Sequence, residues 1–396
     1  MTPTGPAITR RRLVTAAGAA AMLPLIPASV AMAQATPNAS PIPVDIDIDS
    51  SAIREMVGGI IEAKGIPGAI VSIQLPGGNR VDTSVGVADV EASAPIAVNS
   101  HFRAGSITKT MTATLMLQLV GSGAIGLDDI VGDLLPDLQY ADRITIRQLL
   151  SMSSGLFDFL DDPSVFGQIV QDPLGPWTPQ EFIALSNAQP LVFEPGTDIS
   201  YSNTNYIALG LIIEALTGQK IEHALKLRVF QPLRMMNTSL PTTPDLPVPF
   251  ARGYLDGRLL SGEQATPVSG PATPVDYTAL EPSVAWAAGG VVSTVVDLQT
   301  WLHELMTGSL IGEALQAERV AFVDPSGSPE PATYGLGIDR FDDIVGHDGS
   351  ILGYQSFIGR SPSGVSVVAM VNLEPTADFN GVANEIALAC FELIGG

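Results

Sequence analysis

Residues 102–110 read FRAGSITKT and lead into a long apolar segment of the chain. Positions three apart in a helix lie on one face. The sequence therefore predicts that the hydroxyl of Ser106 and the amine of Lys109 lie side by side at the start of a helix. The helix itself is predicted by apolar residues at every fourth position: Ile107, Met111, Leu115 and Leu119.

The pair of Ser106 and Lys109 is typical of a nucleophile with its base. A serine hydroxyl attacks a carbonyl when an adjacent base takes its proton, and a lysine can be that base if its pKa falls from about 10.4. The helix N-terminus would stabilise negative charge at the same point. Only four of the 19 Lys and Arg residues are lysines, which makes a chance pairing less frequent. The alternative is a solvated lysine with Ser106 as an N-cap.

A second polar group, Tyr201 and Asn203, follows a turn and precedes the apolar run 206–213. A phenol beside a lysine ammonium has a lowered pKa and can relay a proton. An amide both donates and accepts hydrogen bonds, so it can orient a lysine and a substrate carbonyl. Without a catalytic role, Asn203 would be an N-cap and Tyr201 a packed aromatic residue.

The third group is His347-Asp348-Gly349-Ser350, which lies among further glycines before residues 354–359. Glycines in such a place indicate a close backbone approach or a bulge in a strand. The imidazole of His347 could face a substrate in a partly protonated form. The backbone N–H after the glycine could stabilise an oxyanion. The alternative is a structural histidine at a strand edge.

Taken in order, the three groups resemble the motifs of the penicillin-recognising serine hydrolases. This family includes class C β-lactamases, D-alanyl-D-alanine carboxypeptidases, D-aminopeptidases and related esterases. The resemblance implies an antiparallel sheet with flanking helices, an all-helical lobe, and a site in the cleft between them. It runs from about Pro67 to Asn372 and includes three further segments, residues 149–156, 287–294 and 334–337.

The resemblance also implies a role for each residue. Ser106 would attack the carbonyl, and Lys109 and Tyr201 would share the proton transfers. Asn203 would orient Lys109 and the substrate. The backbone N–H groups of Ser106 and Ser350 would form the oxyanion hole, with His347 and Gly349 on the substrate side. No cofactor is implied, and the four histidines lack the spacing of metal ligands.

Two residues differ from the β-lactamase form of these motifs. His347 stands where β-lactamases have a lysine, which fits the carboxypeptidase and esterase branches better. Asp348 follows it, where the family usually has a threonine or serine that helps hold a substrate carboxylate. An ionised Asp348 facing the pocket would repel that carboxylate. This position therefore favours neutral substrates.

The pattern of elements predicts an α/β (α+β) fold. Strands at both ends of the chain would form one antiparallel sheet, and a mostly helical lobe would be inserted between them. We expect one hydrolase unit over residues 50–395, with a sheet lobe (50–100 and 290–395) and a helical lobe (101–289). The individual elements predicted are helices at 51–64 and 377–393, a strand at 69–75, two strands within 356–372, and a long loop over the site at 240–282.

The N-terminus predicts export. Arg10-Arg11-Arg12, an Ala-rich apolar stretch and Ala31-Met32-Ala33 have the order of a secretory signal, and the paired arginines indicate the twin-arginine route. We expect a signal at residues 1–35, a linker at 36–49, and a location in the periplasm, on the cell surface or outside the cell. The alternative is an uncleaved anchor, which Pro24 and Pro27 disfavour.

Composition limits the partners. A formal net charge of −22 and the lack of a basic patch disfavour nucleic acid. Cys390 is the only cysteine, so an internal disulfide is impossible. The leading hypothesis is an exported hydrolase that acts through an acyl-enzyme on D-peptide or similar amide bonds, with a small-molecule or peptide substrate such as a peptidoglycan stem peptide. The alternatives are an esterase on neutral esters and a non-catalytic penicillin- or peptidoglycan-binding protein.

Overall fold

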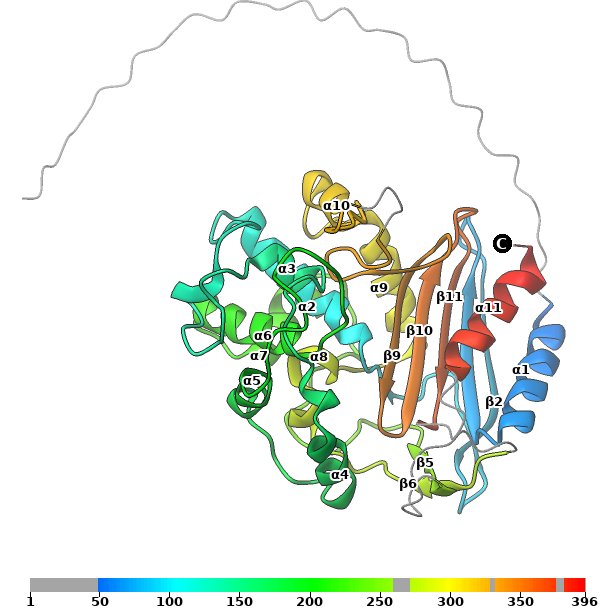
Figure 1. Cartoon of the computed structure of the whole chain (residues 1–396). Coiled ribbons are helices and arrows are strands. Elements are labelled where there is room, and N and C mark those ends of the chain that lie inside the picture. Colours follow the sequence, from blue (N-terminus) through cyan, green and yellow to red (C-terminus); the bar gives the residue numbers. More distant parts are fainter. Residues whose placement is uncertain (1–48, 259–270, 328–331, 375–380, 396) are drawn as a thin grey trace, which may run out of the picture. The chain divides into compact units, whose positions relative to one another are not determined.

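The computed structural model describes residues 49–258, 271–327, 332–374 and 381–395 (Figure 1). The predicted export signal and nearly all of the predicted linker lie outside these residues. The described residues belong to one compact unit that begins at residue 45. None of the helices in this described part is both long enough and apolar enough to span a bilayer.

A seven-stranded antiparallel sheet joins the two ends of the described chain (Figure 1). The N-terminal strand β1 pairs with the C-terminal strand β11, which confirms the predicted sheet built from both ends. In spatial order the strands are β3 (Ala94–Pro95), β2 (Arg80–Asp89), β1 (Gly68–Gln74), β11 (Ser366–Val371), β10 (Tyr354–Arg360), β9 (Ile344–Ile351) and β8 (Asp339–Phe341).

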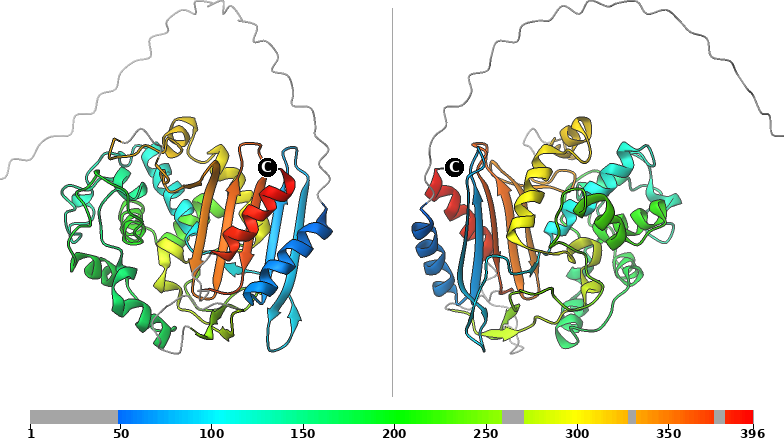
Figure 2. Two further views of the ribbon diagram at one scale, coloured as in Figure 1. Left: turned by 45° about the vertical axis from the view of Figure 1, so that its right-hand side comes forward. Right: turned by 180° about the vertical axis from the view of Figure 1, so that it is seen from behind.

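Helices cover both faces of this sheet (Figures 1 and 2). Helices α1 (Ser50–Lys64) and α11 (Val382–Ile394) pack on one face, and α9 (Val295–Thr307) packs on the other. Neighbouring residues of β1 therefore enter different cores, Ile70 on the α9 side and Val71 on the α1 side. Burial on both faces explains why the central strands β1 and β11 are largely apolar.

The two terminal helices differ slightly from their predicted limits. Helix α1 begins after Asp49, whose carboxylate accepts N–H bonds from the first turn, and it ends at Gly65 with a left-handed φ of 72°. Helix α11 begins at Val382 instead of residue 377. The predicted start, residues 377–380, lies outside the described residues.

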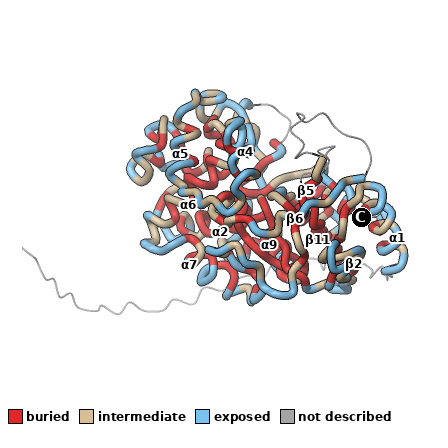
Figure 3. Tube along the Cα trace, turned by 90° about the horizontal axis from the view of Figure 1, so that it is seen from below, coloured by how far each residue is buried: buried red, intermediate tan, exposed pale blue. Residues whose placement is uncertain are grey.

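The middle of the chain is mostly helical, as predicted. Helix α2 (Ile107–Gly121) lies inside this part, so side chains on all its sides are buried (Figure 3). This enclosure places Lys109 in the protein interior. The other α-helices of the described residues are α3 (Ile146–Leu150), α4 (Pro163–Gln171), α5 (Pro179–Asn187), α6 (Thr204–Thr217), α7 (Ile221–Leu225), α8 (Trp286–Gly289) and α10 (Glu313–Arg319).

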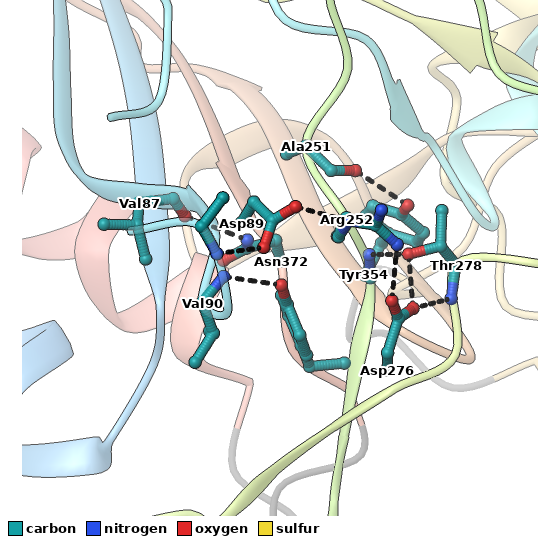
Figure 4. Close-up of polar contacts among 12 residues, drawn as sticks. Val87, Asp89, Val90, Ala251, Arg252, Asp276, Thr278, Tyr354 and Asn372 are labelled. Carbon is teal, nitrogen blue, oxygen red and sulfur yellow. Dashed lines mark hydrogen bonds and ion pairs between the residues drawn. The ribbon is translucent and has the colours of Figure 1, made fainter. Parts of the chain in front are cut away.

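The described residues of the predicted long loop at 240–282 include two short strands. Strands β5 (Tyr254–Asp256) and β6 (Pro274–Asp276) pair within it, and β4 (Phe102–Arg103) pairs with β7 (Val292–Ser293) nearby. Arg252 ties this segment to β2, because its guanidinium lies 2.7 Å from both Asp89 and Asp276 (Figure 4). The residue boundaries of the two expected lobes stay a prediction.

Candidate active site

Ser106 and Lys109 lie together at the start of α2, as predicted. Ser106 occupies the N-cap position, but its side chain makes no capping bond to the helix. Instead its Oγ lies 2.9 Å from the Nζ of Lys109. The sequence pattern alone left a solvated lysine open, and the structure contradicts that alternative because Lys109 is fully buried.

Lys109 has the surroundings of a base. Its Nζ also lies 2.7 Å from Asn203 Oδ1 and 2.8 Å from the carbonyl oxygen of Ala288. Burial lowers the pKa of Lys109 to about 7, although the negative charges of Asp158 and Asp348 act in the opposite direction. A large share of the molecules therefore carries a neutral amine at neutral pH.

The three partners of Lys109 fix the direction of proton transfer. A neutral amine has two N–H donors and one lone pair. The oxygens of Asn203 and Ala288 can only accept, so they take the two N–H groups. The lone pair is then directed at the one partner that can donate, the hydroxyl of Ser106. This arrangement activates the serine for attack.

Asp158 is part of the site, although no sequence motif predicted it. Its Oδ2 accepts a bond of 2.8 Å from Asn203 Nδ2, which turns the amide oxygen of Asn203 toward Lys109. Burial raises the pKa of Asp158, while bonds from Leu160 and Asn203 and the charge of Lys109 oppose the shift. Asp158 lies two residues beyond the family-like segment 149–156, which is the only sequence signal for it.

Tyr201 also contacts Ser106, and a hydrogen bond joins the two hydroxyl groups. The Nζ of Lys109 lies 4.9 Å from the centre of the Tyr201 ring. The expected lowering of the Tyr201 pKa is wrong. Tyr201 is 41% exposed as a residue, yet desolvation of its phenol raises the pKa well above the ordinary value. Tyr201 therefore keeps its proton at neutral pH and serves as a donor.

His347 is buried and neutral, so the expected partly protonated imidazole facing the substrate is wrong. Desolvation lowers its pKa to about 4. Its Nδ1 lies 2.5 Å from the carbonyl oxygen of Asp348, which can only accept, so Nδ1 carries the proton. Its Nε2 then accepts from the hydroxyl of Tyr334 at 2.9 Å. The Tyr334 ring packs edge-on against both Tyr201 and His347, so His347 helps to hold Tyr201 in place through Tyr334.

Two glycines let β9 approach the start of α2, as the glycine pattern predicts. A Cβ on Gly349 would lie 2.2 Å from the oxygen of Ala104 and 3.1 Å from the nitrogen of Ser106. A Cβ on Gly105 would lie 2.7 Å from the nitrogen of Ser350, and the φ of Gly105 is +52°. The backbones around Ser106 and Ser350 are therefore in direct contact.

Asp348 points away from this contact. It pairs in the sheet with Phe357, which belongs to the core beneath α1 and α11. Its carboxylate accepts a bond of 2.9 Å from Asn384 of α11. Neighbouring side chains on a strand face opposite ways, so His347 and Asp348 lie on different faces of the sheet. The expectation that Asp348 faces the pocket and repels a substrate carboxylate is therefore wrong, because its side chain faces α11.

An apolar cavity of about 230 Å³ opens on Ser106. Among the described residues, the polar ones that line it are Ser106, Asn203, Ser350 and Glu374, and His347 does not line it. In the described part of the chain, no group of three or more His, Cys, Asp or Glu side chains is arranged to hold a metal ion. The remaining lining is apolar or glycine: Phe159, Leu160, Phe166, Ile169, Leu280, Val284, Ala285, Ala288, Gly289, Ile351 and Leu352.

A neutral buried amine that contacts a serine hydroxyl beside a cavity is the site of a serine hydrolase. The chain belongs to the β-lactamase family, because the family model described as Beta-lactamase matches residues 52–391. This assignment confirms the resemblance found in the sequence.

Relatives agree with this assignment. The chain is 30% identical to penicillin-binding protein 4 of Amycolatopsis lactamdurans, over 83% of this chain and 85% of that protein. The structure of a D-stereospecific amidohydrolase from Streptomyces sp. is similar, with a TM-score of 0.74 and 30% identity over 88% of this chain and all of that one. The D-amino acid amidase from Ochrobactrum anthropi SV3, complexed with L-phenylalanine, gives a TM-score of 0.74 at 28% identity, covering 87% of this chain and 98% of that chain. The chain spans less than two thirds of the length of several other relatives.

Proposed function

We propose that the protein hydrolyses amide bonds on the carbonyl side of an apolar D-amino acid through an acyl-enzyme on Ser106. The observation that carries this proposal is the contact between the buried Lys109 amine and the Ser106 hydroxyl at the edge of an apolar cavity. The D-configuration is supported by the similarity to a D-stereospecific amidohydrolase and a D-amino acid amidase.

The mechanism follows from the partners of each group. Ser106 Oγ bonds to the substrate carbonyl carbon while its proton passes to Lys109. The backbone N–H groups of Ser106 and Ser350 stabilise the oxyanion. This role is supported by the close approach of the two backbones, which Gly349 makes possible. The carbon–nitrogen bond then breaks, and the leaving amine takes a proton from Tyr201, which regains one from Lys109. Water cleaves the resulting ester by the reverse proton path.

A substrate panel tests this function. We expect D-phenylalanine p-nitroanilide to be cleaved faster than its L-enantiomer, and Ser106→Ala to abolish cleavage. D-Ala-D-Ala peptides, nitrocefin and p-nitrophenyl butyrate in the same panel represent carboxypeptidase, β-lactamase and esterase activity. A preference for any of these three, or for the L-enantiomer, contradicts the proposal. A non-catalytic role is disfavoured, because binding alone requires no buried base.

Export is part of the proposal and rests on the sequence of residues 1–35. A fusion of these residues to a reporter should appear outside the cytoplasm, and replacing Arg11 and Arg12 by lysine should keep it inside. N-terminal sequencing of the exported protein would locate the cleavage site. Equal export of both fusions would contradict the twin-arginine route.

A further inference from the structure

Glu374 places a carboxylate in the active-site cavity. Among the described residues that line the cavity, Glu374 is the one ionisable residue, and the others are apolar residues, a glycine, Ser106, Asn203 and Ser350. It follows the last strand of the sheet, β11, at a distance of over 260 residues in sequence from Ser106. No sequence motif predicted a role for Glu374, and Glu374 takes no part in the proton transfers of the proposed reaction.

The carboxylate of Glu374 is held in a fixed position. Its Oε1 accepts a bond of 2.6 Å from the hydroxyl of Ser350, and its Oε2 accepts a bond from the side-chain amide of Gln355. Its backbone nitrogen donates to the oxygen of Tyr254 at 2.9 Å, and its backbone oxygen accepts from Gly353 at 2.8 Å. Bonds at both the side chain and the backbone leave little freedom for the carboxylate to turn away.

The segment before Glu374 is anchored as well (Figure 4). The amide of Asn372 donates to the oxygen of Val87 at 3.2 Å and accepts from the nitrogen of Gly68 at 2.7 Å. The backbone oxygen of Asn372 accepts from the nitrogen of Tyr254 at 3.1 Å. Strands β1, β2 and β5 therefore all support the position of Glu374.

Glu374 lies close to the place where the substrate carbonyl would react. Ser350 joins the two, because its hydroxyl contacts Glu374 and its backbone nitrogen lies at the contact with Gly105 and Ser106. A substrate carbonyl bound at that contact would place the substituents of its α-carbon next to the Glu374 carboxylate. A carboxylate attracts an ammonium group there and repels a second carboxylate. Each carboxylate oxygen can accept more than one hydrogen bond, so a carboxylate that accepts from Ser350 and Gln355 can also accept from an ammonium group.

We propose that Glu374 binds the α-ammonium group of the substrate, so that the enzyme selects amino-acid amides or peptides with a free amino terminus. This inference rests on the proposed function, because it names the substrate class of the same site. Glu374 would then discriminate between substrates by their charge, a role that the sequence had suggested for Asp348. It also disfavours substrates with a carboxylate close to the scissile bond.

Ligand binding tests the inference separately from catalysis. The Ser106→Ala variant, which cannot form the acyl-enzyme, is titrated by calorimetry with D-phenylalaninamide and with 3-phenylpropanamide, its neutral analogue without the amino group. At pH 6.5 the α-amino group is protonated, because its ordinary pKa is about 7.7–8.0. We expect the ammonium ligand to bind at least about tenfold more tightly, the effect of a hydrogen bond between charged groups.

Two further variants in the Ser106→Ala background complete the test. Glu374→Gln should remove the preference for the ammonium ligand while binding of 3-phenylpropanamide changes less than about twofold, which also shows that the cavity is intact. Asp348→Asn, which removes a carboxylate on the other face of the sheet, should keep the preference. Equal binding of the two ligands, or a preference that survives Glu374→Gln, overturns the inference. Failure of D-phenylalanine p-nitroanilide cleavage would instead overturn the proposed function.

Discussion

Replacing Asp158 by asparagine should move the pH at which the nucleophile becomes active. The carboxylate of Asp158 favours the charged form of Lys109 and so raises the pKa of that amine. Asp158→Asn removes this charge and keeps the size of the side chain. The pKa of Lys109 should therefore fall below its value of about 7, and a neutral amine should be present at more acidic pH.

The magnitude follows from the path between the two charges. Two hydrogen bonds, of 2.7 and 2.8 Å, connect Lys109 to Asp158 through the amide of Asn203. The charges are thus at most about 8 Å apart, and at an effective dielectric of about 20 they interact by about 2 kcal/mol. Since about 1.4 kcal/mol corresponds to one pKa unit, the pKa of Lys109 should fall by about 1.5 units.

The assay is the rate of covalent labelling of Ser106 by a neutral fluorophosphonate between pH 4.5 and 9. Because the reagent does not titrate, the acid limb of the profile reports the enzyme. We expect its midpoint near 7 in the native protein and between about 5 and 6 in Asp158→Asn. The plateau should fall too, because Asn203 loses the carboxylate that orients it.

The control is Asp161→Asn, which removes an exposed carboxylate from the same stretch of chain. Its midpoint should equal that of the native protein. An unchanged midpoint in Asp158→Asn, or a shift to higher pH, would refute the assignment of Lys109 as the base that responds to Asp158.

Four other substitutions test the remaining parts of the site. Ser106→Ala should abolish turnover and all labelling by the fluorophosphonate, and mass spectrometry of the labelled native protein should find the adduct on Ser106 alone. Tyr201→Phe should lower the rate by about 100-fold or more, with the acid midpoint unmoved because Tyr201 stays protonated; a native rate would make Tyr201 structural. Asp348→Thr should leave the ratio of activities on carboxylate-bearing and neutral substrates unchanged, since the side chain faces α11; a rise would restore the charge argument. Gly349→Ala should abolish activity and lower the melting temperature, because its Cβ would meet the oxygen of Ala104 at 2.2 Å; native activity would show that the backbone contact is not needed.

The sequence was sufficient for the parts of the site that depend on local spacing. Ser106 and Lys109 are one helical turn apart, so their contact follows once a helix is predicted. Tyr201 and Asn203 could be added because their motif has a fixed order relative to the first. Gly349 could be identified as a point of close approach, because glycine in a strand has few other uses.

The remaining parts depend on tertiary structure. Whether Asp348 faces the cleft or α11 depends on the register of β9, and a shift of one residue would reverse it. The pKa of Tyr201 depends on burial that its neighbours in sequence do not reveal. Asp158 and Glu374 enter the site through the folding of segments that carry no periodic signal. Prediction from the sequence was therefore wrong for Asp348 and for the pKa of Tyr201, and it did not include Asp158 or Glu374.

The fold was predictable for a related reason. The strands near both ends are apolar and separated by glycine-rich turns, and the middle has helical spacing, so the pairing of the ends was the simplest arrangement. Strands β5 and β6 were missed because each has three residues and they pair across a long connection. Such short strands carry too few residues for an alternating pattern.

The pairing of β1 with β11 also means that the sheet can be completed only late in translation. Ala69 pairs with Val371, so one edge of β1 has no partner until almost the whole chain has been translated. At about 5–20 residues per second, the ribosome takes on the order of 15 to 60 seconds to make the intervening chain. During that interval an apolar strand presents an open edge, which is a template for pairing with other chains. Holdase chaperones that cover this edge during translation should therefore raise the yield of folded enzyme, and premature termination before β11 should produce aggregates.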